Sequence, residues 1–306
     1  MERRQLYVRD FWLIFSIEAV RLPPRERLIM TISWFPGHMN KMRKELKRQA
    51  RDTRAVLELL DARAPLAFAN PLLADLFKGI PRLCILTKPD LADAEITRRW
   101  QHHLQSVGNG YGACLINNPA SPLDNDKISR ALIRLIPDLP AAGRVQVLIT
   151  GVPNVGKSTL LNQIAGRPIA NTGNEPAVTK QLQRHVLNDA FVLVDTPGMM
   201  WPKLADERQA YLLAILGTIR NTAVDQDDIA WFAAEELLTR HKTQVSARFP
   251  EFELQSQPEA LLEHIAVKRG CLVKGGRPDL YRAGELLLND LRSGKLGAFS
   301  LESPPE

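Results

Sequence analysis

Short apolar runs, each followed by polar turn residues, recur along the first two thirds of the chain. Each run is four to six residues long and lies at 55–60, 82–86, 112–116, 145–150 or 191–194. Helical patterns separate several of them, at 93–107 and 157–166. Strand, helix and strand in succession predict an α/β domain with a mostly parallel sheet wrapped by helices. A ligand of such a sheet sits beyond the carboxyl ends of the strands, where the polar residues fall.

The strand signals stop after about residue 200. Amphipathic helical patterns continue the chain, at 204–220, 228–242, 258–269 and 279–293. They predict a smaller, all-helical C-terminal domain over 204–306, after an α/β domain over 30–203. The alternative for the first of these helices is that it packs on the sheet.

Residues 1–29 differ in pattern from the rest of the chain. Their apolar stretch is interrupted by Glu18, and no small-residue cleavage site precedes Pro23 and Pro24. We therefore interpret 1–29 as an N-terminal extension, or as the product of a mis-called start, and not as a secretory signal.

Composition excludes several classes of protein. The 306 residues are 45% hydrophobic and 24% charged, which excludes wholesale disorder and a fibrous repeat. No apolar run reaches the roughly 18 residues of a membrane span, so no membrane partner is expected. Cys84, Cys114 and Cys271 are far apart and form no CxxC pair, which excludes a disulfide framework and a cysteine zinc site. We expect a cytoplasmic protein, active as a monomer.

Positive charge is concentrated in two segments. The net charge is +6, of which residues 40–54 carry +5 and residues 264–297 carry +4. Such density can track a phosphate backbone, although a solvated helix is the alternative for 40–54. The RNA-binding candidates are Lys41, Arg43, Lys44, Lys47, Arg48, Lys268, Arg269 and Lys274.

One segment has the sequence of a phosphate-binding loop. Gly151–Ser158 reads GVPNVGKS, follows an apolar run and opens a helical pattern. Backbone amides of the loop would surround the β-phosphate, Lys157 would reach the β- and γ-phosphates, and the Ser158 hydroxyl would bind Mg²⁺. The nucleotide-binding candidates of this loop are Asn154, Val155, Gly156, Lys157, Ser158 and Thr159.

A second phosphate-side motif comes after the next strong apolar run. Asp195-Thr-Pro-Gly198 comes 37 residues after Ser158, and its carboxylate would hold Mg²⁺ through a water. The amide of Gly198 would meet the γ-phosphate. Thr179 lies between the two motifs, where a threonine can complete the Mg²⁺ shell only while the γ-phosphate is present.

A third motif points to guanine. Thr87-Lys88-Pro89-Asp90 fits [NT]-K-x-D, in which the carboxylate of Asp90 accepts two hydrogen bonds from the base. Adenine lacks that pair of donors, so it would leave Asp90 unpaired. The aliphatic part of Lys88 would lie along the base. Asn117, which comes after the run at 112–116, is a further nucleotide-binding candidate.

The order of the motifs is unusual. Asp90 precedes Gly151 by 61 residues, and no other [NT]-K-x-D lies beyond Gly198. We therefore expect a circularly permuted P-loop GTPase domain. A consequence is that the segment after Gly198 leads directly into the C-terminal helices.

The chain resembles the bacterial ribosome biogenesis GTPase A (YlqF-type) family of circularly permuted GTPases, from about Ile32 to Glu302. The motifs that carry the resemblance are WFPGHM at 34–39, DAR at 61–63, TKPD at 87–90, GVPNVGKST at 151–159, DTPGMMWPK at 195–203, KRGC at 268–271 and LND with GKLG between 288 and 297. The resemblance implies a cytoplasmic, Mg²⁺-dependent GTPase in late assembly of the large (50S) ribosomal subunit. Ala177 and Thr87 depart from the family's usual Gly and Asn.

Hydrolysis needs a group that this chain lacks at the usual place. The residue after the DTPG motif is Met199, and a thioether cannot orient a water. Our candidate is His38, for which the resemblance supports a catalytic role alongside Lys157; its alternative is to cap the basic helix or to contact RNA. In related potassium-activated GTPases an asparagine at the position of Asn154 coordinates K⁺, which would add positive charge beside the phosphates. Arg63 is near the site by topology, and a structural salt bridge is its expected role.

Three other functions compete with a GTP-hydrolysing assembly factor whose turnover the ribosomal particle stimulates. One is a nucleotide-gated rRNA-binding scaffold with slow hydrolysis. Another is a small-subunit assembly GTPase, although the added OB-fold or zinc domain usual there has no signal here. An ATP-dependent kinase is the last, and TKPD argues against it.

Overall fold

The computed structural model describes residues 36–106, 110–136, 138–140, 143–170, 182–198, 207–219 and 225–305, with side chains from Arg43 onward. The extension at 1–29, Thr179 and Met199 lie outside the described residues. The side chains of His38 and Lys41 do so as well.

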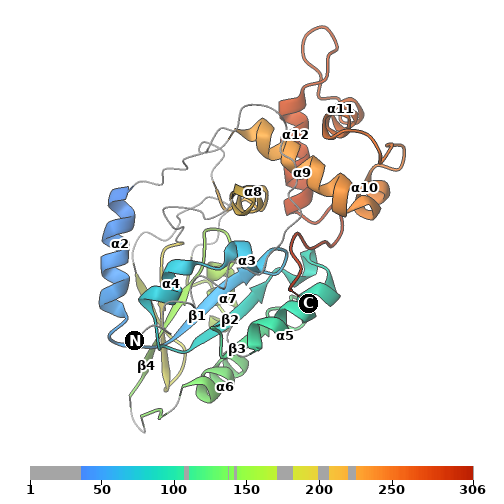
Figure 1. Ribbon diagram of the computed structural model, residues 1–306. Helices are drawn as coiled ribbons and strands as arrows, with labels where there is room; N and C mark the ends of the chain where they lie inside the picture. The colour runs from blue at the N-terminus through green and yellow to red at the C-terminus, as the bar shows by residue number, and fades with distance from the viewer. Residues whose placement is uncertain are drawn as a thin grey trace, which may run out of the picture.

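A mixed, six-stranded sheet forms the centre of the larger part (Figure 1). Its strands are β1 Thr53–Asp61, β2 Arg82–Thr87, β3 Ala113–Ile116, β4 Val145–Thr150, β5 Gln183–Val186 and β6 Phe191–Asp195. They lie in the order β3-β2-β1-β4-β6-β5, and all neighbours are parallel except β5 and β6. The mostly parallel sheet is confirmed, and the five predicted strands are found within two residues of their expected ends.

Strand β5 is the strand that the hydrophobic pattern misses. Its sequence is QRHV, and its side chains are exposed or half-buried. It lies at the edge of the sheet, where it pairs with β6 alone and has little apolar surface to cover. An edge strand of this kind carries no run of apolar residues for a pattern to detect.

Helices cover both faces of the sheet. They are α2 Pro36–Gln49, α3 Pro65–Phe68, α4 Pro71–Leu76, α5 Ala94–Gln105, α6 Asn125–Leu135 and α7 Lys157–Ala165, with the 3-10 turn η1 at Pro89–Leu91. Helix α5 packs against β2 and β3, and α6 packs against β2. The basic helix α2 lies on the opposite side (Figure 1), where Leu46 is buried against Val56 and Leu148. Leu46 thus anchors the helix to the sheet, while Arg43, Lys44 and Lys47 face outward.

The C-terminal part is all-helical, as predicted. Its helices are α8 Glu207–Ile215, α9 Gln226–Arg240, α10 Lys242–Arg248, α11 Pro258–Lys268 and α12 Leu280–Arg292. The pattern at 228–242 proves to belong to α9, and the chain turns at His241 into the separate helix α10. Helix α8 contacts α3 as well as α9, so it lies between the sheet and the other helices (Figure 1). Among the described helices, none has both the length and the apolar composition to cross a membrane.

After α12 the chain returns to the sheet. We call this returning segment, Gly294–Glu302, the C-terminal strap. The amide of Phe299 donates to the Leu91 carbonyl at 3.1 Å. The Trp100 indole on α5 donates to the Glu302 carbonyl at 3.2 Å. The strap therefore joins the helical part to the sheet, and the C-terminus lies near α5 (Figure 1).

Candidate nucleotide-binding site

The carboxyl ends of the parallel strands bring the distant motifs to one edge of the sheet. Asp61 and Thr87 are paired in register at the ends of β1 and β2. Asp195 is paired with Ile149, two residues before the phosphate loop. Strand order therefore assembles residues that lie up to 134 positions apart in the chain, counting from Asp61 to Asp195.

The phosphate loop needs glycine at its first position. Gly151 has φ +154°, and a Cβ there would lie 2.9 Å from both the Leu59 carbonyl oxygen and Val155 Cγ1. Gly156 has φ +108° and precedes the first residue of α7. Ser158 and Thr159 fall in the first turn of that helix, where free amides and the helix dipole favour a phosphate.

Lys157 is held inside its own loop. Its Nζ donates to the carbonyl oxygens of Gly151 at 3.0 Å and Val152 at 3.3 Å. Desolvation lowers the pKa of Lys157 to about 8, and the charge of Asp195 partly opposes that shift. The ammonium is therefore buried beside a carboxylate, with two loop carbonyls that a phosphate can replace as its partners.

The DTPG motif lies directly against the phosphate loop. Thr196 donates from both its amide and its hydroxyl to the Ile149 carbonyl, at 3.1 and 3.0 Å. A Cβ on Gly198 would lie 2.9 Å from Pro153 Cα, so only glycine allows this approach. The two phosphate-side motifs therefore form one continuous wall.

The donor set of this wall fits Mg²⁺. The Ser158 hydroxyl and the buried Asp195 carboxylate are hard oxygen ligands, which Mg²⁺ prefers beside phosphate oxygens and water. Within the described residues no group of three or more His, Cys, Asp or Glu side chains could hold a metal by itself.

The guanine motif is tied to the phosphate loop by side chains. The Thr87 hydroxyl shares its one proton between the carbonyl oxygen of Val155, at 2.7 Å, and that of Leu60, at 3.1 Å. Lys88, with φ +53°, donates from Nζ to the Asn154 carbonyl at 2.9 Å. Asp90 is exposed in the turn η1. The arrangement leaves the carboxylate of Asp90 open to solvent while its neighbours are anchored.

The comparisons with known proteins agree with this geometry. A sequence model of the family described as 50S ribosome-binding GTPase matches residues 146–251, from β4 onward. The chain is 35% identical over 286 residues to ribosome biogenesis GTPase A of Bacillus licheniformis, covering 90% of this chain and 100% of that protein. It is 31% identical over 279 residues to the same-named protein of Thermotoga maritima, covering 90% and 95%.

The chain belongs to the ribosome biogenesis GTPase A family.

Solved structures of this family share the fold. A GDP-bound structure of YlqF has a TM-score of 0.62 and 26% identity, over 86% of this chain and 100% of that one. A GNP-bound YlqF from T. maritima has a TM-score of 0.60 and 26% identity, over 87% and 99%. The protein is therefore a GTPase that takes guanine nucleotides. Its guanine motif precedes the matched segment at 146–251, as the circular permutation requires.

Two predicted site residues have protein partners in this family member. Asn117 donates to Gln163 at 3.3 Å and accepts from the Leu123 amide at 3.1 Å, so it braces the first helix after the phosphate loop. Asn154 donates to the Gly217 carbonyl at 2.8 Å, just beyond α8. Their contacts with nucleotide, and that of Asn154 with K⁺, stay predictions.

The candidate RNA-binding cations fall into two groups. Arg43, Lys44, Lys47 and Lys274 are exposed. The others with described side chains are exposed as well, but they form ion pairs: Arg48 with Glu45, Lys268 with Glu251 and Arg269 with Asp290. Asp290 also pairs with Arg248 at 2.7 Å, so the family's KRGC and LND motifs meet at this carboxylate. No sequence spacing signals this meeting.

Replacing Thr87 by valine is expected to weaken GTP and GDP binding about tenfold. The hydroxyl proton that this buried residue shares between Val155 and Leu60 would be lost, which costs roughly 1–1.5 kcal/mol. The free energy of unfolding should fall by about 1–2 kcal/mol in urea titrations. Nucleotide titration by calorimetry measures the first effect.

Thr97→Val is the matched control for that variant. Thr97 is also buried, and its hydroxyl donates to the Asp93 carbonyl at 2.7 Å within α5. It should lose stability and keep its affinity for nucleotide. Equal affinities of the Thr87 variant and the wild type would contradict the tie between guanine motif and phosphate loop.

Proposed function

We propose that the protein binds and hydrolyses GTP in late assembly of the large (50S) ribosomal subunit, in the cytoplasm, and that the subunit stimulates its hydrolysis. The observation that carries this proposal is the extent of the similarity. It covers 90% of this chain and all of a protein named ribosome biogenesis GTPase A, so it includes the C-terminal helices as well as the sheet. A likeness confined to the GTPase half would support nucleotide chemistry alone.

In this proposal the residues at the carboxyl ends of the strands bind the nucleotide. Lys157 and the amides of the phosphate loop bind the phosphates, and Asp90 reads the base. Ser158, Thr179 and, through a water, Asp195 would hold Mg²⁺, which would supply positive charge beside the phosphates. Asn154 would place K⁺ there as well.

The exposed cations would hold ribosomal RNA. Arg43, Lys44 and Lys47 project from α2, which Leu46 fixes to the sheet. Lys274 belongs to the turn between α11 and α12, and that turn lies far from α2 (Figure 1). Two separated contacts of this kind suit a large, folded RNA better than a short single strand.

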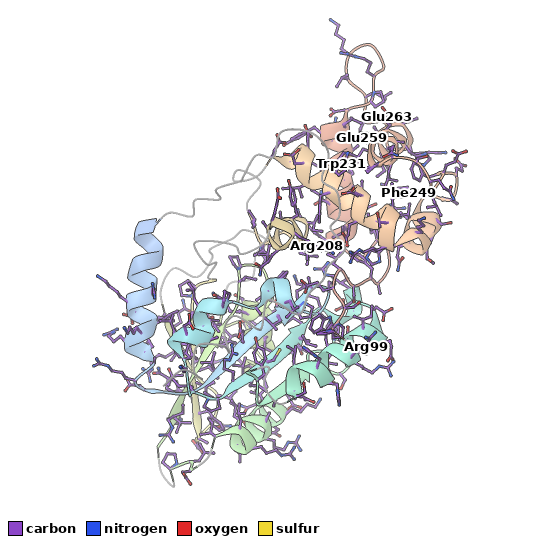
Figure 2. The ribbon with its side chains drawn as sticks, in the orientation of Figure 1. Arg99, Arg208, Trp231, Phe249, Glu259 and Glu263 are labelled. Carbon is purple, nitrogen blue, oxygen red and sulfur yellow. The ribbon has the colours of Figure 1, made fainter. Side chains whose placement is uncertain are left out.

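A change from GTP to GDP would affect the helical part through a short segment of chain. Gly198 ends the motif against the phosphate loop, and α8 begins at Glu207. Arg208 of α8 lies between the sheet and the other helices (Figure 2), where it donates to Glu236 at 2.8 Å and to the Leu301 carbonyl at 3.1 Å. A shift of the DTPG motif would therefore act on α9 and on the strap.

GTP turnover with purified ribosomal subunits tests the proposal. We expect large subunits to raise turnover by at least tenfold in KCl, small subunits to have no effect, and NaCl to abolish the stimulation. Stimulation in both salts would discard K⁺ and keep the partner. Stimulation by small subunits alone would overturn the assignment to the large one.

His38→Ala is expected to keep GTP affinity within about twofold and to lower subunit-stimulated turnover by about 10²-fold, the size of a general acid–base contribution. Stopped-flow phosphate release in the presence of large subunits measures it. His38→Gln, which can still orient a water, should retain part of the stimulation. Unchanged stimulated turnover of the alanine variant would exclude the catalytic role.

A further inference from the structure

The lysine of the guanine motif is fixed at both ends of its side chain. Its backbone has a left-handed φ of +53°. Its Nζ lies 2.9 Å from the Asn154 carbonyl oxygen and 3.1 Å from Asp61 Oδ2. Because the backbone and the ammonium are both held, these contacts set where the aliphatic part of Lys88 lies. They also offset the rotamer entropy that a long side chain loses when it is held.

Asp61 is in turn held by Arg63. The guanidinium donates from Nε to Oδ1 at 2.9 Å and from Nη2 to Oδ2 at 2.8 Å, and the Arg63 amide adds a third bond at 3.1 Å. Both side chains are at most 1% exposed. Burial alone would raise the pKa of Asp61, but the charges of Arg63 and Lys88 outweigh it and hold that pKa well below its usual range. The carboxylate is thus favoured in its charged form and is held in place by three hydrogen bonds from Arg63.

Arg63 also meets the C-terminal part of the chain. Its carbonyl accepts a 2.7 Å hydrogen bond from the Leu301 amide of the C-terminal strap. Its Nη1 is 3.5 Å from the Leu291 carbonyl oxygen of α12. One residue therefore touches the strap, the last helix and the carboxylate behind the guanine motif.

The C-terminal strap also contacts the turn η1, which contains Asp90. The Phe299 amide donates to the carbonyl of Leu91, the residue after Asp90. Gly294 approaches Leu91 so closely that a Cβ there would lie 2.7 Å from Leu91 Cδ2. The turn that presents Asp90 is thus braced by Gly294 and Phe299, while Lys88 is braced through Asp61 and Arg63.

We propose that Asp61 and Arg63 are positioning residues for guanine recognition, and that through them the base site and the C-terminal strap stabilise each other. Asp61 positions the Lys88 side chain along the base. Arg63, which binds both Asp61 and the strap, makes the position of Asp61 depend on whether the strap is docked. A bound guanine then tightens the strap, and a displaced strap weakens the base site, because coupling between two sites is reciprocal. The inference requires guanine-nucleotide binding and is independent of the ribosomal partner.

A double-mutant cycle tests the action of Asp61 through Lys88. GDP affinity is measured by calorimetry for Asp61→Asn, Lys88→Met and the double variant. We expect about tenfold weaker binding for each single variant, and no further loss in the double variant than in Lys88→Met alone. A double variant about 100-fold weaker than the wild type would mean independent effects and would overturn the proposal, as would an unchanged affinity of Asp61→Asn.

Glu58→Gln is the matched control. Glu58 is another fully buried carboxylate of β1, and it pairs with Arg82 at 3.3 Å. Loss of this carboxylate should lower the melting temperature of the protein and leave GDP affinity unchanged. Equal losses of affinity in Glu58→Gln and Asp61→Asn would assign the effect to the fold of the strand, against the proposal.

Hydrogen exchange of the strap gives a second test that does not need the Asp61 variants to fold. Saturating GDP is expected to slow exchange of the Phe299 and Leu301 amides about tenfold in the wild type, and less than twofold in Lys88→Met. No change in the wild type, or the same change in both proteins, would overturn the coupling. Wild-type protein that fails to bind GDP at all would instead overturn the GTPase assignment.

Discussion

Asp90→Ala is expected to weaken GTP binding about 10²- to 10⁴-fold and to leave the weak binding of ATP unchanged. Two hydrogen bonds to a charged carboxylate would be lost, each worth about 1.5–3 kcal/mol. Since about 1.4 kcal/mol is a factor of ten, the sum gives that range. Competition between GTP and ATP, followed by fluorescence of a bound analogue, measures the selectivity.

The structure makes this variant a clean test. Asp90 is exposed in the turn η1, whose ends are closed by the backbone bonds from Leu91 to Lys88 and from Ala92 to Pro89. Its side chain can therefore be shortened without opening the core. Asp75→Ala, at an exposed position on α4, is the control and should keep the affinity for GTP. A variant at Asp90 that still prefers GTP to ATP by the wild-type factor would refute the role of TKPD in guanine reading.

Lys157→Met is expected to weaken GTP and GDP binding by about 10²-fold or more. The ammonium is expected to contact phosphate oxygens through charge-assisted bonds, which are about twice as strong as neutral ones. Methionine keeps the length of the side chain and removes the charge, so the packing of α7 is preserved. Calorimetric titration measures the loss, and Lys78→Met, at an exposed position after α4, is the control.

The same lysine predicts a pH dependence. Its pKa of about 8 without nucleotide means that the ammonium is present below that pH and is lost above it. Phosphates bind the ammonium form, so nucleotide binding takes up a proton above pH 8. We expect GDP affinity to fall up to about tenfold between pH 8 and pH 9 in the wild type, and to stay constant over that interval in Lys157→Met. A flat profile in the wild type would contradict the lowered pKa.

The local elements near the site can be predicted because each has its own pattern. Buried parallel strands such as β4 and β6 are continuous apolar runs, and the loop from Gly151 to Ser158 combines glycines with a lysine and a serine. The structural salt bridge expected of Arg63 is present, and its partner is Asp61. Strand β5, α3, α4, α6 and the break at His241 were not predicted, because these elements are short, exposed or amphipathic without a clear boundary.

The sequence alone determined the class of fold, the permuted order of the motifs and the guanine-nucleotide chemistry, because these depend on residues close together in the chain. Tertiary structure decided which partners those residues have. Thr87 is tied to Val155, Asn154 to Gly217, and Arg63 to Asp61 and to the strap, across as many as 238 positions from Arg63 to Leu301. Such pairs are set by which strand ends and helix ends meet when the core packs, and no local pattern records them.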